Sequence, residues 1–206
     1  MEVRKPLGWH LSGIYGGQVM LLKEVYESAK IVNMGATRIT VNEFTDQLPA
    51  LRPEVLLEAA RGVIEVMDWH VDKIVTEEDK GAPLATAVSI LTGIPMAIAR
   101  WYSYSLDEVN EVCVDLESEY FQGQLYLNGV VAGDRVIIVD DTLSTGGAII
   151  SLVEAVRKSG ADVVDVVCAI EKVQNKGKKH VFEKTGIAVK TLVRIALSED
   201  KVSVLD

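Results

Sequence analysis

The stretch from Arg135 to Ala148 constrains the fold of this chain more than any other. It begins with four β-branched apolar residues, 136–139, a run that indicates a buried strand of a parallel sheet. Two adjacent carboxylates, Asp140 and Asp141, follow the run. A short polar turn then leads into apolar residues at helical spacing, which end at Gly160. The stretch therefore predicts a strand, a polar turn and a helix in direct succession.

The turn after the acidic pair has the chemistry of an anion site. It precedes a predicted helix N-terminus, where backbone N–H groups and the helix dipole favour a bound anion. Hydroxyl groups add donors, and two glycines let the backbone approach a phosphate closely. Because the two carboxylates would repel that phosphate, we expect them to face sugar hydroxyls or a chelated cation of the same ligand. The turn consists of Thr142, Leu143, Ser144, Thr145, Gly146 and Gly147.

Strands and helices alternate along most of the remaining chain. Helices are predicted over residues 15–31, 53–68 and 83–91, and in a lysine-rich stretch after 172. Strands are predicted over 73–76, 94–99, 163–170 and 189–195, with short strands between 32 and 44. This order is typical of an α/β fold with a doubly wound, mainly parallel sheet. Ligands bind such sheets at the carboxyl ends of the strands, where the polar motifs fall.

Composition excludes several classes of protein. The 206 residues are 49% hydrophobic, enough to bury the core of one α/β domain, and no apolar run approaches the roughly 20 residues of a membrane span. A net charge of −9 argues against a nucleic-acid-binding surface. Cys113 and Cys168 are far apart, which suggests a reduced, cytoplasmic protein, and the three histidines form no zinc-type cluster. We therefore expect neither a membrane nor a nucleic-acid partner.

The string from 135 to 148 resembles the binding motif for phosphoribosyl pyrophosphate (PRPP) in type I phosphoribosyltransferases. That motif has four apolar residues, two acids and a T/S-T-G-G turn. The resemblance implies that residues 142–147 hold the 5′-phosphate. It makes Asp140 and Asp141 catalytic groups that hold the ribose hydroxyls and the hydration shell of Mg²⁺, which PRPP carries and no side chain ligates directly. It also implies one phosphoribosyltransferase domain over 1–206, and a homodimer.

A second charged turn, residues 76–83, leaves one predicted strand and enters a helix. It resembles the pyrophosphate-binding loop of the same family, in which Glu78 and Gly81 match a Glu-x-x-Gly pattern. The resemblance implies that Glu78, Asp79, Lys80 and Gly81 surround pyrophosphate. The backbone N–H groups of the last two would face it, with a non-proline cis bond between them as one form of this loop.

The next predicted strand ends at Arg100, where the family often has an Arg-Lys pair that reaches pyrophosphate. Trp101 stands in place of the lysine, so only the arginine of the pair is available here to contact pyrophosphate. Residues 101–128 are long for a connection and resemble the flexible loop that closes over PRPP in this family. Tyr104 lies on the outgoing part, where the family places a Tyr or Ser near the reacting centre; an exposed tyrosine in a surface hairpin is the alternative. Residues 119–127 resemble the returning strand of archaeal hypoxanthine/guanine members.

The C-terminal part resembles bacterial xanthine and archaeal hypoxanthine/guanine phosphoribosyltransferases, through Ile-Glu-Lys at 170–172, a basic helix and KTLVRI. This implies that Lys172, a donor without an acceptor, meets the exocyclic oxygen of a purine; a solvated strand end is the alternative. Residues 1–50 are expected to form a small hood over the base, with Phe44 as a base contact. Ser144 replaces the aspartate of human-type members, so the proton acceptor is unassigned.

The implied reaction is transfer of 5-phosphoribosyl from PRPP to hypoxanthine or guanine, with release of pyrophosphate, in purine salvage. Adenine is the main rival acceptor, and orotate is a weaker one because the C-terminal part resembles purine members. A different class is a regulator that senses PRPP and binds nucleic acid. That class predicts an added helix-turn-helix or a strongly basic face. The basic run of this chain is limited to Lys172, Lys176, Lys178 and Lys179.

Overall fold

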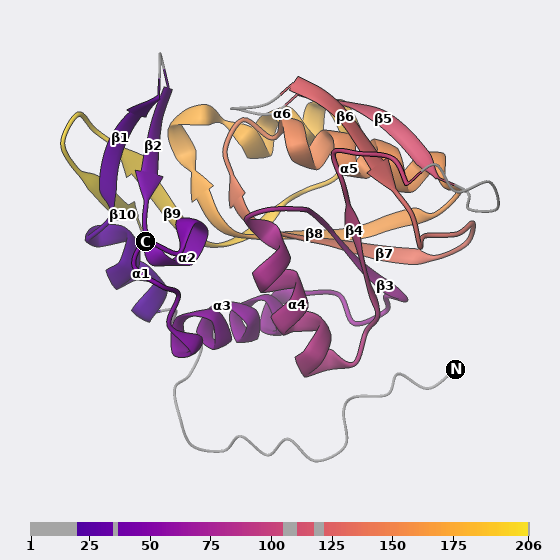
Figure 1. Cartoon of the computed structure of the whole chain (residues 1–206), viewed down its shortest axis with the longest axis horizontal. Coiled ribbons are helices and arrows are strands. Elements are labelled where there is room, and N and C mark those ends of the chain that lie inside the picture. Colours follow the sequence, from indigo (N-terminus) through magenta and orange to yellow (C-terminus); the bar gives the residue numbers. More distant parts are fainter. Residues whose placement is uncertain (1–19, 35–36, 105–110, 118–121, 206) are drawn as a thin grey trace.

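A six-stranded sheet crosses the molecule in the order β10-β9-β8-β7-β3-β4 (Figure 1). This computed structural model describes residues 20–34, 37–104, 111–117 and 122–205. Neighbouring strands pair in parallel from β4 to β9, and β10 is antiparallel to β9. The predicted doubly wound, mainly parallel sheet is therefore confirmed. Its strands are β3 Lys73–Glu77, β4 Met96–Ala99, β7 Arg135–Leu143, β8 Asp162–Lys172, β9 Lys190–Leu197 and β10 Val202–Leu205.

Helices cover both faces of the sheet, as the strand–helix alternation predicts. In Figure 1, α3 and α4 lie on one face, and α5 and α6 lie on the other. The apolar run of β7 is buried on both sides because its side chains alternate: Ile137 and Val139 pack with α3 and α4, whereas Val136 and Ile138 pack with α5. The helices are α3 Pro53–Val66, α4 Gly81–Thr92, α5 Gly147–Lys158 and α6 Gly177–Thr185, with a 3-10 turn, η1, at Val173–Asn175.

Two smaller units stand outside the sheet. The hood consists of α1 Met20–Glu27, β1 Lys30–Met34, β2 Thr37–Val41 and α2 Glu43–Asp46, and α1 contacts β9 and β10 at the sheet edge (Figure 1). The arm is an antiparallel pair, β5 Val112–Glu117 and β6 Gln122–Leu127, that packs on α5. It lies within the predicted loop of 101–128, whose residues 105–110 and 118–121 lie outside the described part. No helix among the described residues is long and apolar enough to cross a membrane.

Local chemistry explains where several helices begin and end. α3 begins with Pro53, and its lack of an N–H costs nothing because the first N–H of a helix has no partner within the helix. α4 ends at Gly93 with φ of 72°, in the left-handed region where a residue without Cβ is unstrained. α5 has Arg157 and Lys158 in its last turn, where positive charge is favourable to the helix dipole.

Several predicted boundaries are wrong. The helix predicted over 15–31 ends at Glu27, because Lys30 to Met34 pair with β2; residues 15–19 lie outside the described part. α4 begins at Gly81, two residues before the predicted start at Pro83. The strand β7 continues through the predicted turn to Leu143, because β8 is long enough to pair with Thr142 and Leu143. The edge strand β10 is not predicted by the sequence.

Candidate active site

A cavity of about 180 Å³ lies at the carboxyl ends of β3, β7 and β8. Neighbouring parallel strands bring their carboxyl ends to one edge of the sheet, which is why segments far apart in sequence meet here. Three of the predicted segments line this cavity together: the acidic pair with the turn after it, the loop after β3, and Lys172 at the end of β8. The hood contributes Ile39 and Thr40 from β2 and Thr45 from α2.

The acidic pair, Asp140 and Asp141, lies near the carboxyl end of β7 with side chains that are almost fully buried. The Asp141 N–H donates to Asp140 Oδ1 at 2.9 Å. Burial raises the pKa of Asp140 well above its usual value, and the negative charges of Asp141 and Glu77 raise it further. Burial also raises the pKa of Asp141. Such a pair is stabilised in its ionised form by positive charge or by hydroxyl donors that arrive with a ligand.

Residues 142–147, here called the cradle, join β7 to the N-terminus of α5. Gly146 precedes that helix with φ of 90°, and no side chain caps the helix. A Cβ on Gly146 would lie 2.7 Å from Val181 Cγ2 and 3.1 Å from the Gly177 carbonyl oxygen. Only glycine therefore fits this position, both in conformation and in space. The uncapped N–H groups of α5 remain available to an anion.

The segment that follows Lys172 holds the cradle in place through hydrogen bonds and close packing. Asn175 Nδ2 donates to Ser144 Oγ at 2.6 Å, and His180 Nδ1 donates to the Thr145 carbonyl oxygen at 2.9 Å. Gly177 lies so close to the Ser144 carbonyl oxygen that a Cβ there would overlap it. The cradle is therefore held in place by groups that do not belong to its own motif.

The second loop, residues 77–81, joins β3 to α4 and lies beside the acidic pair. Asp79 has φ of 82°, and no side chain caps α4 either. Gly81 packs directly on the acidic pair: its Cβ would lie 2.5 Å from Thr76 Oγ1 and closer still to Asp140 Oδ1. The bond between Lys80 and Gly81 is not cis; among the described residues the cis bond is Leu48–Pro49. Two uncapped helix N-termini thus reach one cavity from neighbouring strands.

Trp101 follows β4 and is hydrogen-bonded to the 77–81 loop. Its backbone N–H donates to Glu78 Oε1 at 2.7 Å, and its indole Nε1 donates to Glu77 Oε1 at 2.8 Å. Burial raises the pKa of Glu77 to about 7, because the indole hydrogen bond only partly offsets it and the charge of Asp141 adds to it. Glu77 is therefore a cavity carboxyl that titrates near neutral pH.

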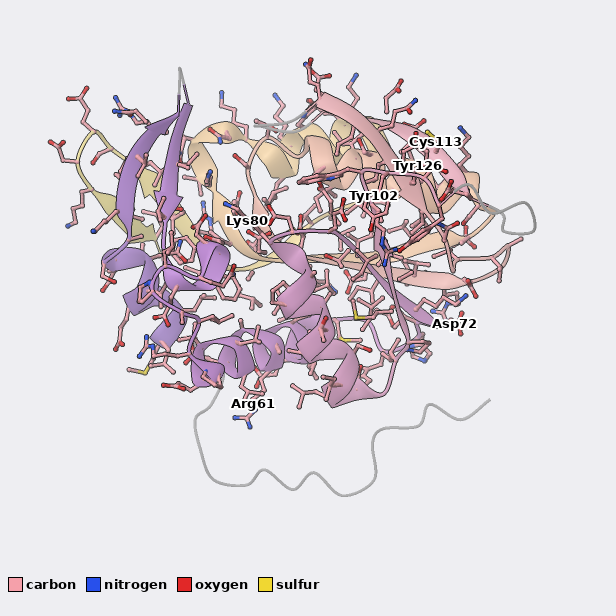
Figure 2. All side chains as sticks on the ribbon, in the orientation of Figure 1. Arg61, Asp72, Lys80, Tyr102, Cys113 and Tyr126 are labelled. Atoms are coloured by element: carbon pink, nitrogen blue, oxygen red, sulfur yellow. The ribbon has the colours of Figure 1, made fainter. Side chains whose placement is uncertain are left out.

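Three of the predicted site residues are not among the described residues that line the cavity. Arg100 Nη1 donates to the Ile98 carbonyl oxygen at 2.9 Å, and its guanidinium lies 5.1 Å from the ring centre of Tyr104. Tyr104 is largely exposed and packs edge-on against Tyr102, and Figure 2 shows Tyr102 on the arm side of the site. Phe44 is 3% exposed and packs in the hydrophobic core, because α2 points it away from the cavity.

Comparison with known proteins identifies the family to which this chain belongs. Residues 53–194 match the family described as the phosphoribosyl transferase domain. The chain belongs to the phosphoribosyltransferase family. Sequence relatives include the hypoxanthine/guanine phosphoribosyltransferases of Methanotorris igneus and Methanococcus vannielii. Both are 43% identical to 90% of this chain, and the matches cover 100% and 98% of those proteins.

Solved structures share the same phosphoribosyltransferase fold. The adenine phosphoribosyltransferase of Thermoanaerobacter pseudethanolicus matches with a TM-score of 0.69 at 21% identity, over 84% of this chain and 99% of that one. The Trypanosoma brucei adenine phosphoribosyltransferase, solved with AMP, pyrophosphate and ribose-5-phosphate, matches with a TM-score of 0.68 at 17% identity, over 84% and 78% of the two chains. At these identities the likeness shows the fold.

Sequence reasoning missed several contributors to this phosphoribosyltransferase site. Glu77 precedes the Glu-x-x-Gly pattern and looks like one more charge in an acidic turn. Tyr26, from α1, is fully buried close enough to the acidic pair that the charge of Asp141 adds to burial in raising its pKa. Asn175 and His180 follow Lys172, and their spacing matches no motif that would predict a role in the site. Each reaches the site through contacts between distant segments, which periodicity does not reveal.

Proposed function

We propose that this phosphoribosyltransferase transfers the 5-phosphoribosyl group of PRPP to a 6-oxopurine, hypoxanthine or guanine, and releases pyrophosphate. The observation that carries the proposal is the pair of uncapped helix N-termini, of α4 and α5, on either side of a buried acidic pair. PRPP has two phosphate ends separated by a ribose, and this arrangement offers two anion sites separated by carboxylates. The relatives at 43% identity carry the name hypoxanthine/guanine phosphoribosyltransferase.

In this proposal the cradle binds the 5′-phosphate and the 77–81 loop binds pyrophosphate through backbone N–H groups. Asp140 and Asp141 accept hydrogen bonds from the ribose hydroxyls. The breaking carbon–oxygen bond places positive charge on the ribose ring, so two carboxylates close to the ring stabilise the transition state more than the bound substrate. Burial of the pair strengthens this effect because little water screens it.

The residues of the cavity fit Mg²⁺ that enters with PRPP. Burial raises the pKa of both Asp140 and Asp141, the charge of Asp141 raises that of Asp140 further, and a nearby cation would favour the ionised pair. Within the described part of the chain, no group of three or more His, Cys, Asp or Glu side chains is arranged to hold a metal ion. In this proposal the substrate and water supply most ligands of the ion, as the family resemblance implies. When bound, it stabilises the negative charge of the leaving pyrophosphate.

The base end of the cavity is proposed to lie between Lys172 and the hood. Lys172 is 3% exposed and lines the cavity at the end of β8, and Thr40 and Thr45 of the hood line the same cavity. Its ammonium can donate to an exocyclic oxygen, whereas the amino group of adenine would present a second donor. Loss of one hydrogen bond from a buried donor costs about 1–3 kcal/mol, and more when the donor is charged. We propose Thr40 and Thr45, rather than Phe44, as the hood residues nearest the base, because they line the cavity.

Closure, assembly and location are further proposals for this enzyme. The arm and the residues that connect it to β4 are proposed to close over bound PRPP and exclude water, with Tyr104 and Arg100 moving toward the cavity. The enzyme is proposed to be a homodimer, as the family resemblance implies. Cys113 and Cys168 are free thiols, which supports a cytoplasmic location.

A substrate panel tests the function. Adenine, hypoxanthine, guanine, xanthine and orotate are each incubated with PRPP and Mg²⁺, and nucleotide formation is followed. We expect hypoxanthine or guanine to exceed adenine in kcat/KM by about tenfold or more, because the amino group of adenine would place a donor where the Lys172 ammonium meets an oxygen acceptor. Lys172→Ala should reduce this preference. A preference of the unaltered enzyme for adenine would contradict the proposed acceptor, and a preference that survives Lys172→Ala would move the selector to the hood segment 41–47.

A further inference from the structure

The side chain of Lys80 does not point into the cavity as a free cation. Its Nζ donates to Asp46 Oδ1 at 2.7 Å, which joins the N-terminus of α4 to the end of α2 in the hood. Figure 2 shows Lys80 between the hood and the sheet. The two residues are 34 positions apart in the chain, so this ion pair exists only because the hood folds over the carboxyl ends of the strands.

Asp46 is held rigidly in place by its own neighbours. Its Oδ2 accepts hydrogen bonds from Thr45 Oγ1 at 2.6 Å and from the Asn42 N–H at 3.1 Å. Burial alone would raise the pKa of the carboxyl, but the hydrogen bonds from Lys80, Thr45 and Asn42 outweigh it and hold the pKa below its usual value. Asp46 is therefore charged at neutral pH and fixed to the residue, Thr45, that lines the base end of the cavity.

The 77–81 loop is equally well fixed on its other side. Gly81 packs on Asp140 and Thr76 without room for a methyl group, so the loop is held in direct contact with Asp140 of the acidic pair. Lys80 is the residue next to it, and Lys80 holds the loop from the side of the hood. A displacement of the hood would therefore be transmitted to the backbone N–H groups that the proposed function assigns to pyrophosphate.

We propose that Asp46 and Lys80 form a positioning pair that couples the base end of the cavity to its pyrophosphate end, so that each substrate is bound less well when the pair is broken. The inference rests on the proposed function, because it uses the assignment of the two ends. Neither side chain takes part in the chemistry: the pair fixes the distance between Thr45 and the 77–81 loop. The consequence is a cross effect: a change in the hood weakens the binding of PRPP, and a change in the loop weakens the binding of the purine.

Steady-state kinetics of Lys80→Met, Asp46→Asn and the double variant test this. Each single variant should raise the KM for both PRPP and hypoxanthine by a factor of about three to ten, in the lower part of the range for directly coupled side chains, with a smaller change in kcat. The double variant should be no worse than the more impaired single variant, because both remove the same interaction. Lys80→Arg, which can keep the ion pair, should restore both KM values.

A matched control lies at the other end of β3, the strand that leads into the 77–81 loop. Lys73 Nζ lies 2.6 Å from Asp134 Oδ2, and the side-chain exposures of 22% and 14% are close to the 34% and 14% of Lys80 and Asp46. Lys73→Met should lower thermal stability about as much as Lys80→Met and leave both KM values unchanged. This separates positioning from a general loss of stability.

Three results would overturn the inference. The first is a rise in the KM of one substrate only, and the second is additive losses in the double variant. The third is the same loss of affinity in the Lys73→Met control. If the unaltered enzyme forms no nucleotide from any base of the panel, the proposed function fails and the inference fails with it. Nucleotide formation without the cross effect overturns the inference alone.

Discussion

Replacement of Gly81 by alanine should damage catalysis more than stability. Inside a helix, alanine is favoured over glycine by about 0.5–1 kcal/mol, which is an upper limit at Gly81, the first residue of α4. At this position the added Cβ would lie 2.5 Å from Thr76 Oγ1 and closer to Asp140 Oδ1, so either the loop or the acid must move. Overpacking of this kind costs about 1–3 kcal/mol, which leaves a net destabilisation of at most about 2.5 kcal/mol. Because the loop and Asp140 both belong to the site, kcat/KM should fall by at least about tenfold.

The control for Gly81→Ala is Gly93→Ala at the other end of α4. Gly93 has φ of 72° with no atom within 4 Å of its Cβ position, so alanine there strains the backbone without touching the site. Urea denaturation and steady-state kinetics are measured for both. We expect similar losses of stability but a catalytic defect in Gly81→Ala alone. Full activity of Gly81→Ala, or an equal catalytic defect in Gly93→Ala, would refute the argument that the loop is packed on the acidic pair.

Three further predictions follow from the site. Asp140→Asn with Asp141→Asn should lower kcat far more than the affinity for a ribose 5-phosphate product; equal losses would make the acids simple binding groups. The raised pKa of Glu77, about 7, means that the folded protein binds more protons than the unfolded chain between about pH 4.5 and 7 and loses stability as pH rises through that window. Glu77→Gln should therefore gain stability relative to the unaltered protein across it, by at most about 1.4 kcal/mol per pH unit, and a constant difference in urea denaturation would disprove the assignment. Asn175→Ala should raise the KM for PRPP with kcat retained, because Ser144 loses a donor at 2.6 Å; an unchanged KM would show that the cradle needs no such support.

The sequence predicts the sheet well because its strands carry their own signals. The run 136–139 is apolar on both faces, as a central parallel strand requires, and the structure buries both faces. The strand continues past this run for a reason that lies elsewhere: Thr142 pairs with Ile170 of the long β8. In the same way, Lys30 and Ile31 continue a helical pattern but pair with Val41 and Thr40. Pairing between distant segments decides these boundaries, and a local pattern does not contain it.

The site shows the same division. The acidic pair, the cradle and the 77–81 loop are continuous motifs, and they are found together at one cavity because each follows a parallel strand. The Lys80–Asp46 ion pair and the Trp101–Glu77 hydrogen bond join residues that are 34 and 24 positions apart, and nothing in the spacing of the sequence predicts them. The place of Phe44 in the hood predicts a base contact, whereas the structure packs Phe44 in the core and its neighbour Thr45 lines the cavity.

Calorimetric titration with PRPP in the presence of Mg²⁺ is the most direct test of the account. The cradle and the 77–81 loop predict saturable binding of PRPP to the unaltered protein. Gly146→Val should abolish that binding, because the position has φ of 90° and a Cβ there would lie 2.7 Å from Val181 Cγ2. Thermal denaturation shows whether the variant remains folded. Absence of PRPP binding to the unaltered protein would contradict the assignment of the cavity and, with it, the proposed function.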